Sequence, residues 1–506
     1  MRRWVLVATI IASSMTFIDG TVVNVALPAL QQSLNATITD VQWVVEAYAL
    51  FLGALILVGG SLGDQLGRRK VFLAGVISFT AASILCGFAP TPLILIVGRA
   101  LQGIGAALLV PGSLAIITAT FDGEDRGRAI GTWSGFSAIT TALGPVGGGW
   151  LIEHVSWRAV FFINVPLAII VVVLSLRWMP ESKDPDRVGR IDWWGGALTV
   201  LGLSGIVFGL IEWTPLGARH PLVLASLAIG VLALVLLVVV ESRVENAMLP
   251  LTLFNDRAFT LTNVLTLFLY AALAVMMFLV PLNLIQVRGF SATVAGAALL
   301  PFPVIMFALS RWSGGLVSRV GRRLPLTIGP TIAAAGLAIL AIDPRGGAFW
   351  PVFLTGVVVL GLGMAVTVAP LTTTVMDSVP AGHSGVASGV NNAVSRVAGL
   401  LAIAAFGVAM SGVFEHRVVP RLDRLALPAD ARAAVNRELP KMAGAELERI
   451  GLTSEQRTAV HGAIGMAFGG VFRVAMIGAA VLAGVAACVG LGIGGSSLTA
   501  ESQKRS

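Results

Sequence analysis

Residues 19–28 read DGTVVNVALP, and they lie within an apolar segment from Trp4 to about Leu30 in which Asp19 is the only charge. The segment is long enough to cross the hydrocarbon core of a bilayer as a helix. A carboxylate at that depth costs several kcal/mol, so intramembrane acids are usually functional. We therefore interpret Asp19 as a functional residue. The alternative is an acid that is satisfied by neighbouring hydroxyls and has no further role.

The composition is that of an integral membrane protein. Hydrophobic residues make up 56% of the 506 residues and charged residues only 12%, about half the charged fraction of a soluble protein. The net charge is +8, but the basic residues are scattered between apolar segments, so membrane orientation explains them better than nucleic-acid binding. The five histidines and two cysteines form no metal-ligand pattern, and no phosphate-binding loop is present. We therefore predict a protein that is not an enzyme and uses no metal or cofactor.

The apolar runs predict an all-α polytopic membrane protein with about fourteen transmembrane helices. The predicted spans are residues 4–29, 41–61, 71–89, 93–118, 128–152, 158–178, 193–213, 220–240, 259–285, 293–312, 325–342, 348–370, 386–411 and 466–494. The first run has no convincing cleavage site, so we interpret it as a retained helix. Lys and Arg are concentrated in the connections on the side of Arg2 and Arg3, so both termini are expected in the cytoplasm. The polar segment 412–465 is then expected outside, with some amphipathic helix.

The chain repeats itself. Residues 60–69 read GSLGDQLGRR, and residues 314–323 read GGLVSRVGRR. Downstream, the glycines at 103 and 105 align with those at 361 and 363 at one constant offset. We therefore expect two six-helix halves of similar design around a central substrate site, as in many secondary transporters. The expected domains are residues 1–190, an inserted helix pair at 191–245, and residues 246–506, which include the segment 412–465.

Four motifs together carry a family resemblance. They are the run at 19–28 extended by WVVEAYAL at 43–50, the loop at 60–69, RALQGIG at 99–105, and Gly131 and Thr140 followed by GPVGGG at 144–149. These motifs resemble those of the major facilitator superfamily, and specifically its fourteen-helix drug:proton antiporter branch. The resemblance covers the whole chain. It implies two pseudo-symmetric six-helix bundles with two inserted helices between them.

The resemblance implies a role in proton coupling for Asp19 on the first helix and for Arg99 on the fourth. Glu46 stands where the family more often has a small or hydroxyl residue. At 1.5 Å per residue, all three lie at similar depths in the outer half of the membrane, so we expect one shared site with about one uncompensated carboxylate. We predict that Asp19, more than Glu46, exchanges its proton, and that Arg99 sets the pH range of this exchange. The alternative for Arg99 is a structural role, capped by backbone carbonyls.

Two further motifs imply conformational roles. The loop residues Gly60, Gly63, Asp64, Gly67, Arg68 and Arg69 would latch the outward-facing state, and the alternative is plain anchoring by positive charge. The glycines allow a tight turn, and the charges can form alternative ion pairs. The helix 5 residues Gly131, Thr140, Gly144, Pro145, Gly148 and Gly149 resemble the antiporter signature, which would set the direction of transport. The alternative is close helix packing without mechanistic meaning.

A candidate substrate cavity is a further prediction from the sequence. Its residues are Asn24, Tyr48, Gln102, Met276, Phe302, Met306, Asn391 and Arg396. Met and Phe form soft apolar linings but are also ordinary packing residues. Arg396, about ten residues into its helix, is expected either to line the substrate path or to pair structurally.

The leading hypothesis is a proton-coupled exporter of lipophilic or cationic small molecules, of the multidrug-efflux type, in a bacterial inner or plasma membrane. Its expected partners are the substrate, protons and membrane lipid. One alternative is an exporter of a dedicated endogenous lipid, metabolite or antibiotic. An alternative of another class is a transporter-like sensor or assembly partner that docks an envelope protein through 412–465. Asp19→Asn is expected to abolish proton-driven export and to leave expression intact.

Overall fold

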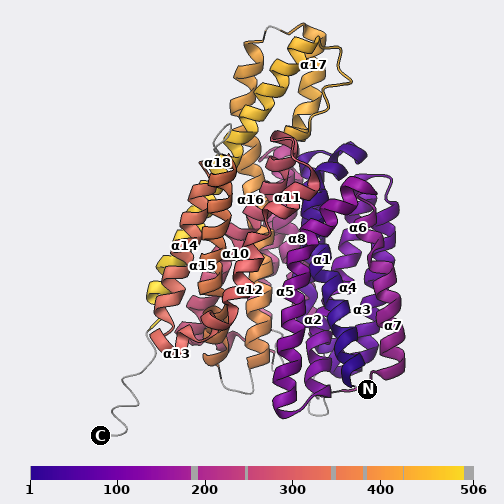
Figure 1. The fold of residues 1–506 in the computed structure, drawn as a ribbon, viewed down its shortest axis with the longest axis vertical. Helices are drawn as coiled ribbons and strands as arrows, with labels where there is room; N and C mark the ends of the chain where they lie inside the picture. The colour runs from indigo at the N-terminus through magenta and orange to yellow at the C-terminus, as the bar shows by residue number, and fades with distance from the viewer. Residues whose placement is uncertain are drawn as a thin grey trace. The chain divides into compact units, whose positions relative to one another are not determined.

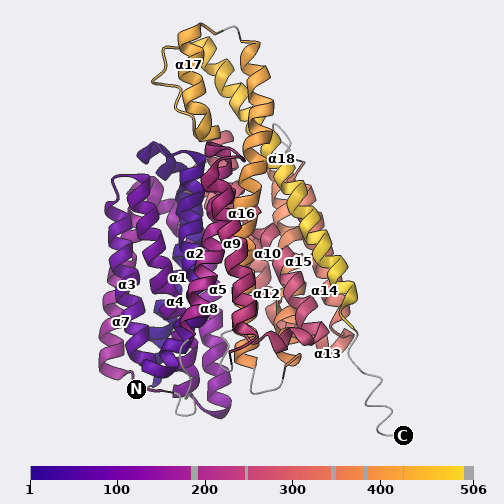
Figure 2. The ribbon, with the colours of Figure 1, turned by 180° about the vertical axis from the view of Figure 1, so that it is seen from behind.

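The computed structural model describes residues 2–183, 192–244, 249–342, 349–379, 384–425 and 427–494. These residues form helices joined by short connections, which Figures 1 and 2 trace from opposite sides. The first half contains α1 (Arg2–Leu34), α2 (Ile38–Leu66), α3 (Arg68–Phe88), α4 (Pro92–Thr120), α5 (Gly123–His154), α6 (Ala159–Phe162), α7 (Asn164–Trp178), α8 (Trp193–Leu216) and α9 (Pro221–Glu241). The rest contains η1 (Leu251–Asn255), α10 (Arg257–Leu282), η2 (Asn283–Val287), α11 (Ala292–Ala298), α12 (Pro301–Gly314), α13 (Leu316–Val320), α14 (Arg323–Leu340), α15 (Phe349–Asp377), α16 (Ser384–Asp423), α17 (Ala429–Glu438), η5 (Leu439–Gly444) and α18 (Ser454–Gly492).

The prediction of an all-α polytopic membrane protein is confirmed. Within the described residues, 13 helical segments are long and apolar enough to cross a membrane. Each of them overlaps one predicted span. The remaining predicted span, 128–152, lies inside α5, a helix of 32 residues.

Local sequence signals explain where the helices begin and end. Thr37 caps α2: its Oγ1 accepts from the backbone of Asp40 at 3.1 Å, and its own backbone donates to the Asp40 carboxylate at 2.8 Å. This reciprocal pattern is a capping box. Gly67 separates α2 from α3 with φ of +117°, a conformation that residues with a Cβ rarely adopt.

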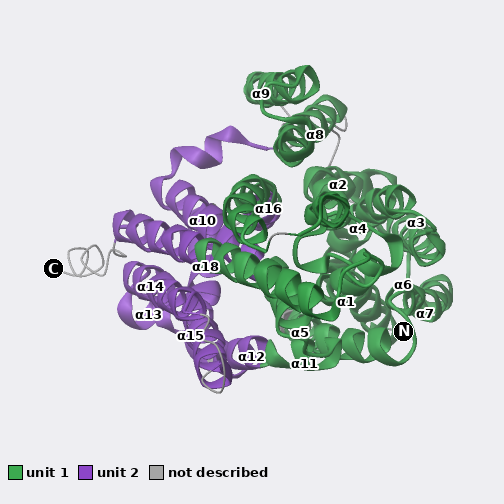
Figure 3. Ribbon diagram, turned by 90° about the horizontal axis from the view of Figure 1, so that it is seen from above, with its two compact units in different colours: residues 1–248, 277–300, 400–475 green, residues 249–276, 301–399, 476–506 purple. Residues whose placement is uncertain are grey.

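Contacts divide the chain into two compact units, coloured in Figure 3. Unit 1 contains residues 1–248, 277–300 and 400–475, and unit 2 contains residues 249–276, 301–399 and 476–506. The expected domains 1–190, 191–245 and 246–506 follow chain order and stay a prediction. Within unit 1, residues 400–475 contact the other helices through η5, which packs on α1, α2 and η2, and through Ile403 of α16, whose carbonyl accepts from Gln42 of α2. Helices α10, α16 and α18 each have residues in both units.

The internal repeat has a structural counterpart within each unit. In unit 1, a Cβ added to Gly103 would lie 2.6 Å from a backbone oxygen of α2, and one added to Gly105 would lie 2.6 Å from a backbone nitrogen of α3. In unit 2, a Cβ on Gly361 would meet α12 at 3.3 Å, and one on Gly363 would meet the backbone of α14 at 2.4 Å. The aligned glycines therefore let α4 and α15 approach equivalent neighbours closely.

The helices around the segment 412–465 are longer than predicted. The spans predicted at 386–411 and 466–494 lie within α16, of 40 residues, and α18, of 39 residues. Figures 1 and 2 show the end of α16, α17 and the start of α18 coming together. Apolar length predicted only the apolar parts of α16 and α18, because it cannot detect the polar residues that continue both helices.

Candidate functional site

A buried ion pair joins α1 to α4. The guanidinium Nη1 of Arg99 donates to Oδ2 of Asp19, and the two side chains are only 2% and 1% exposed. The other carboxylate oxygen of Asp19 accepts from Nε2 of Gln102 at 3.1 Å. Both oxygens of the first-helix acid are therefore satisfied, and its charge is matched by that of Arg99.

Arg99 also binds α2 and its own helix. Its Nε donates to the carbonyl of Val44 at 3.1 Å, and its Nη1 donates to Oε1 of Gln102 at 2.8 Å. The Tyr48 ring lies 4.2 Å from the guanidinium carbon, which is cation–π distance. Arg99 thus ties α1, α2 and α4 together.

The polar network extends to residues that the sequence analysis missed. Nε2 of Gln102 donates to Ser83 on α3 at 2.6 Å, and Asn164 on α7 donates to the same hydroxyl at 3.2 Å. Both side chains are buried. The available signal was a polar residue within each of the predicted spans 71–89 and 158–178.

Glu46 does not belong to this network. It lies on α2, its side chain is 0% exposed, and neither carboxylate oxygen has a hydrogen-bond partner among the described residues. At 3.6 residues per turn, Glu46 lies on the face of α2 about opposite to that of Val44 and Tyr48, which contact Arg99. The structure therefore brings Asp19 and Arg99 together and places Glu46 on another face of α2.

The cavity candidates fall into separate groups. Tyr48 and Gln102 belong to the Asp19–Arg99 network, whereas Asn24 donates to the backbone of Gly20 at 3.3 Å within α1. In unit 2, Asn391 donates to Asn263 at 3.1 Å and to Thr266 at 2.8 Å, both on α10. The other candidates also lie in unit 2: Met276 and Phe302 are buried, and Met306 and Arg396 are half-buried.

The predicted latch loop contacts the chain that follows α7. Arg68 pairs with Asp64 one turn earlier, with Nη2 2.9 Å from Oδ1. The Arg69 side chain donates to the carbonyl of Met179 at 2.9 Å, and its backbone donates to Glu181 at 3.0 Å. A Cβ on Gly67 would lie 2.8 Å from the Glu181 carboxylate, so glycine is needed here for space as well as for φ. Gly60 and Gly63 lie in the last two turns of α2. The latch role itself stays a prediction.

The helix 5 motif packs α5 against α1 and α11. A Cβ on Gly144 would lie 2.4 Å from Thr21 Oγ1, and one on Gly148 would lie 2.7 Å from Val22, both on α1. A Cβ on Gly149 would lie 2.5 Å from the carbonyl oxygen of Ala292 on α11. The motif therefore shapes two close helix contacts.

The other three residues of this motif have different surroundings. Pro145 lies inside α5, and its carbonyl oxygen would be 2.2 Å from a Cβ on Gly296 of α11. Thr140 donates to the carbonyl of Ser137 at 3.0 Å, and Gly131 has open space around it. The direction-setting role of the motif stays a prediction.

The segment 412–465 binds the end of α1 through a buried lysine. Lys441 on η5 donates from Nζ to Asn35 and, at 2.8 Å, to Glu438. Its carbonyl accepts from Gln31 of α1 at 3.0 Å, and Gln286 donates to the same Gln31 side chain at 2.8 Å. Partial burial acts to raise the pKa of Glu438, but the hydrogen bond from Lys441, with further donors and charges, lowers it overall. The segment is therefore attached to the helix that carries Asp19.

Lys441→Met is expected to lower the free energy of unfolding by about 1–3 kcal/mol, because it removes a charged donor from two acceptors. Arg449→Met is the matched control, since the Arg449 side chain is 84% exposed and its pair with Glu446 spans 3.6 Å, a geometry worth about 0–1 kcal/mol. Hydrogen exchange of residues 429–450 should increase only in Lys441→Met. Equal effects of the two changes would contradict this account.

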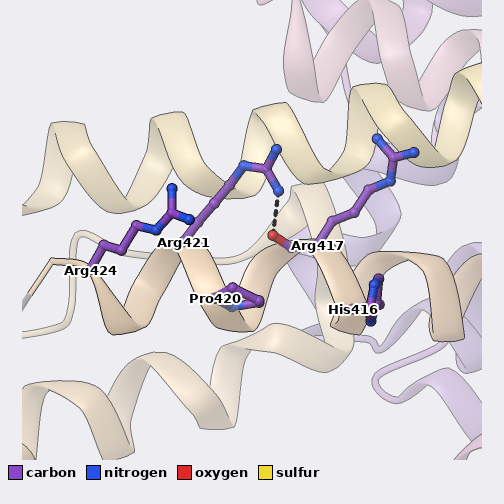
Figure 4. A pocket seen from close by; sticks show the side chains of 5 residues that line it. All are labelled: His416, Arg417, Pro420, Arg421 and Arg424. Carbon is purple, nitrogen blue, oxygen red and sulfur yellow. Dashed lines mark hydrogen bonds between the residues drawn. The ribbon is translucent and has the colours of Figure 1, made fainter.

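A hollow of about 390 Å³ lies on the same segment. Its walls are His416, Arg417, Pro420, Arg421 and Arg424, which Figure 4 shows along one helix. Arg421 donates to the backbone carbonyl of Arg417. These residues belong to none of the motifs found in the sequence, although arginines at spacings of four and three recur on one helical face.

Spanning helices, repeated close packing and a buried ion pair are features of polytopic membrane transporters. The chain belongs to the Major Facilitator Superfamily, whose family model matches residues 9–403. It is 33% identical over 435 residues to the multidrug resistance protein Stp of Mycobacterium tuberculosis, covering 86% of this chain and 80% of that protein. It is 34% identical over 416 residues to a tetracenomycin C resistance and export protein of Streptomyces glaucescens, covering 81% and 76%.

Solved structures show the same fold. A bacterial homologue of the human lysosomal transporter Spinster, in an inward-facing and unoccupied conformation, matches with a TM-score of 0.65. The two chains are 18% identical, and the match covers 98% of this chain and 99% of that one. At this identity the likeness concerns the fold alone.

Proposed function

We propose that this chain is a proton-coupled secondary exporter of lipophilic or cationic small molecules that works by alternating access. The observation that carries the proposal is the buried Asp19–Arg99 pair inside spanning helices, which is costly to maintain without a function. Membership in a transporter family and relatives named for multidrug and antibiotic resistance support a small-molecule cargo. Transport, rather than catalysis, is the activity that these observations favour.

Orientation and location are part of the same proposal. The basic connections on the side of Arg2 and Arg3 favour cytoplasmic termini. The segment 412–465 would then lie on the outer side of a bacterial inner or plasma membrane. Protons moving inward down their gradient would drive cargo outward, and the loop at 60–69 and the helix 5 motif would control the exchange of conformations.

A dedicated endogenous cargo is the second candidate function. The relatives include a tetracenomycin C resistance and export protein and a probable actinorhodin transporter, which are named for single compounds. A transporter-like docking protein has less support. The segment 412–465, which would dock the partner, is already bound to this chain, because Gln31 of α1 donates to the carbonyl of Lys441 on η5. The test is transport by the purified protein in liposomes with an imposed pH gradient, against a panel of dyes, lipids and antibiotics.

A further inference from the structure

Glu46 is a second buried acid in unit 1, and it lies outside the Asp19–Arg99 network. Its side chain is 0% exposed, and neither oxygen has a hydrogen-bond donor among the described residues. Asp19, by contrast, has Arg99 on one oxygen and Gln102 on the other. Two acids in one helical unit thus differ completely in their partners.

The groups around this part of α2 form no hydrogen bond with the Glu46 carboxyl among the described residues. Arg99 is engaged by Asp19 and by the carbonyl of Val44, on the opposite face of α2. Glu212 of α8 accepts from Trp43 Nε1 at 2.9 Å, one turn from Glu46.

On its other side, the face of α2 that carries Glu46 approaches α16. Gln42, also one turn from Glu46, donates to the carbonyl of Ile403 at 3.2 Å. A Cβ on Gly407 would lie 1.9 Å from the Gln42 amide, so the approach is close. The carboxyl therefore lies next to a tight helix contact.

Burying an ionised carboxylate without a partner costs far more than burying its neutral acid. In this buried conformation, the low-energy form of Glu46 therefore carries a proton. Releasing that proton would leave a bare charge beside the α2–α16 contact, and this charge is stabilised only if water or a cation reaches it. Proton release is thus linked to opening of this face of α2.

We propose that Glu46 binds the exchanged proton and that Asp19 is a positioning residue, held with Arg99. The inference rests on the proposed exporter function and deepens it. A proton from water on one side of the membrane binds a carboxylate oxygen of Glu46, and the same proton leaves to water on the other side. The ion pair of Asp19 holds α1 against α4 throughout this cycle.

These roles are tested in liposomes with a fluorescent cationic dye. Dye counterflow measures transport, and gradient-driven accumulation measures its coupling to protons. Glu46→Gln mimics the protonated acid, so it should keep dye counterflow but lose gradient-driven accumulation, which reaches about tenfold per pH unit for one proton exchanged. Glu46→Asp should keep coupling with a shifted pH profile. Glu212→Gln is the matched control and should behave as the wild type, whereas Asp19→Asn should lose both modes. A Glu46→Gln protein with wild-type accumulation and pH profile would overturn the proposal.

Infrared difference spectroscopy gives a readout that does not depend on transport. The carbonyl stretch of a protonated carboxylic acid should be present in the wild type near neutral pH and missing in Glu46→Gln. Persistence of that band in the variant would overturn the assignment. If the wild type shows no gradient-driven accumulation, the proposed exporter function fails, and the band alone decides whether Glu46 holds a proton.

Discussion

Asp19→Asn is expected to stop gradient-driven transport and to lower the free energy of unfolding by about 3–5 kcal/mol, the typical result of breaking a buried pair from one side. The change leaves the Arg99 guanidinium buried, 2% exposed, without a counter-charge. Thermal unfolding of the purified protein measures the stability loss. The sequence alone predicted lost export with intact expression, and the structure adds this destabilisation.

A double-mutant cycle with Arg99→Gln separates the ion pair from other effects. The doubly neutral protein, with both changes, should regain much of the stability that each single change loses, because no uncompensated charge remains buried. Transport should stay absent in the double variant, since the charged link between α1 and α4 is gone. Simple addition of the two stability losses would contradict a direct interaction between these side chains.

Gly149→Ala is expected to be the most disruptive single-methyl change in the helix 5 motif. The added Cβ would lie 2.5 Å from the carbonyl oxygen of Ala292, so the backbones of α5 and α11 must move apart. Overpacking of this kind costs about 1–3 kcal/mol. The unfolding temperature of the purified variant should fall, and so should the drug resistance of cells that express it.

Gly147→Ala is the control for this change, two residues away in the same helix. A Cβ there has nothing within 4 Å, and Gly147 is exposed. Alanine also has a higher helix propensity than glycine, by about 1 kcal/mol, so this protein should be as stable as the wild type or more so. Equal losses at 147 and 149 would show that helix flexibility, rather than the α5–α11 contact, matters in this motif.

The sequence predicted the helices and the repeat well because both depend on local patterns. Apolar length located the spans, and the aligned glycines at 103, 105, 361 and 363 occupy equivalent helix contacts. The ends of α16 and α18 were harder, because apolar length cannot detect the polar residues that continue both helices.

The site was predicted in part. Residue counting gave Asp19, Glu46 and Arg99 similar depths, but depth does not say which face of a helix meets which neighbour. In the structure, α2 turns Tyr48 toward Arg99, and this leaves Glu46 on the opposite side. Ser83 and Asn164 were missed because each is one of several polar residues in its apolar span and belongs to no distinctive motif.

The central claim, proton-coupled export, is tested most directly by dye transport in liposomes that contain only this protein. With an imposed pH gradient, we expect a cationic dye to accumulate on the acidic side and the accumulation to collapse when an ionophore dissipates the gradient. Liposomes without protein are the control. Dye movement that is unchanged when the gradient is dissipated would contradict the claim.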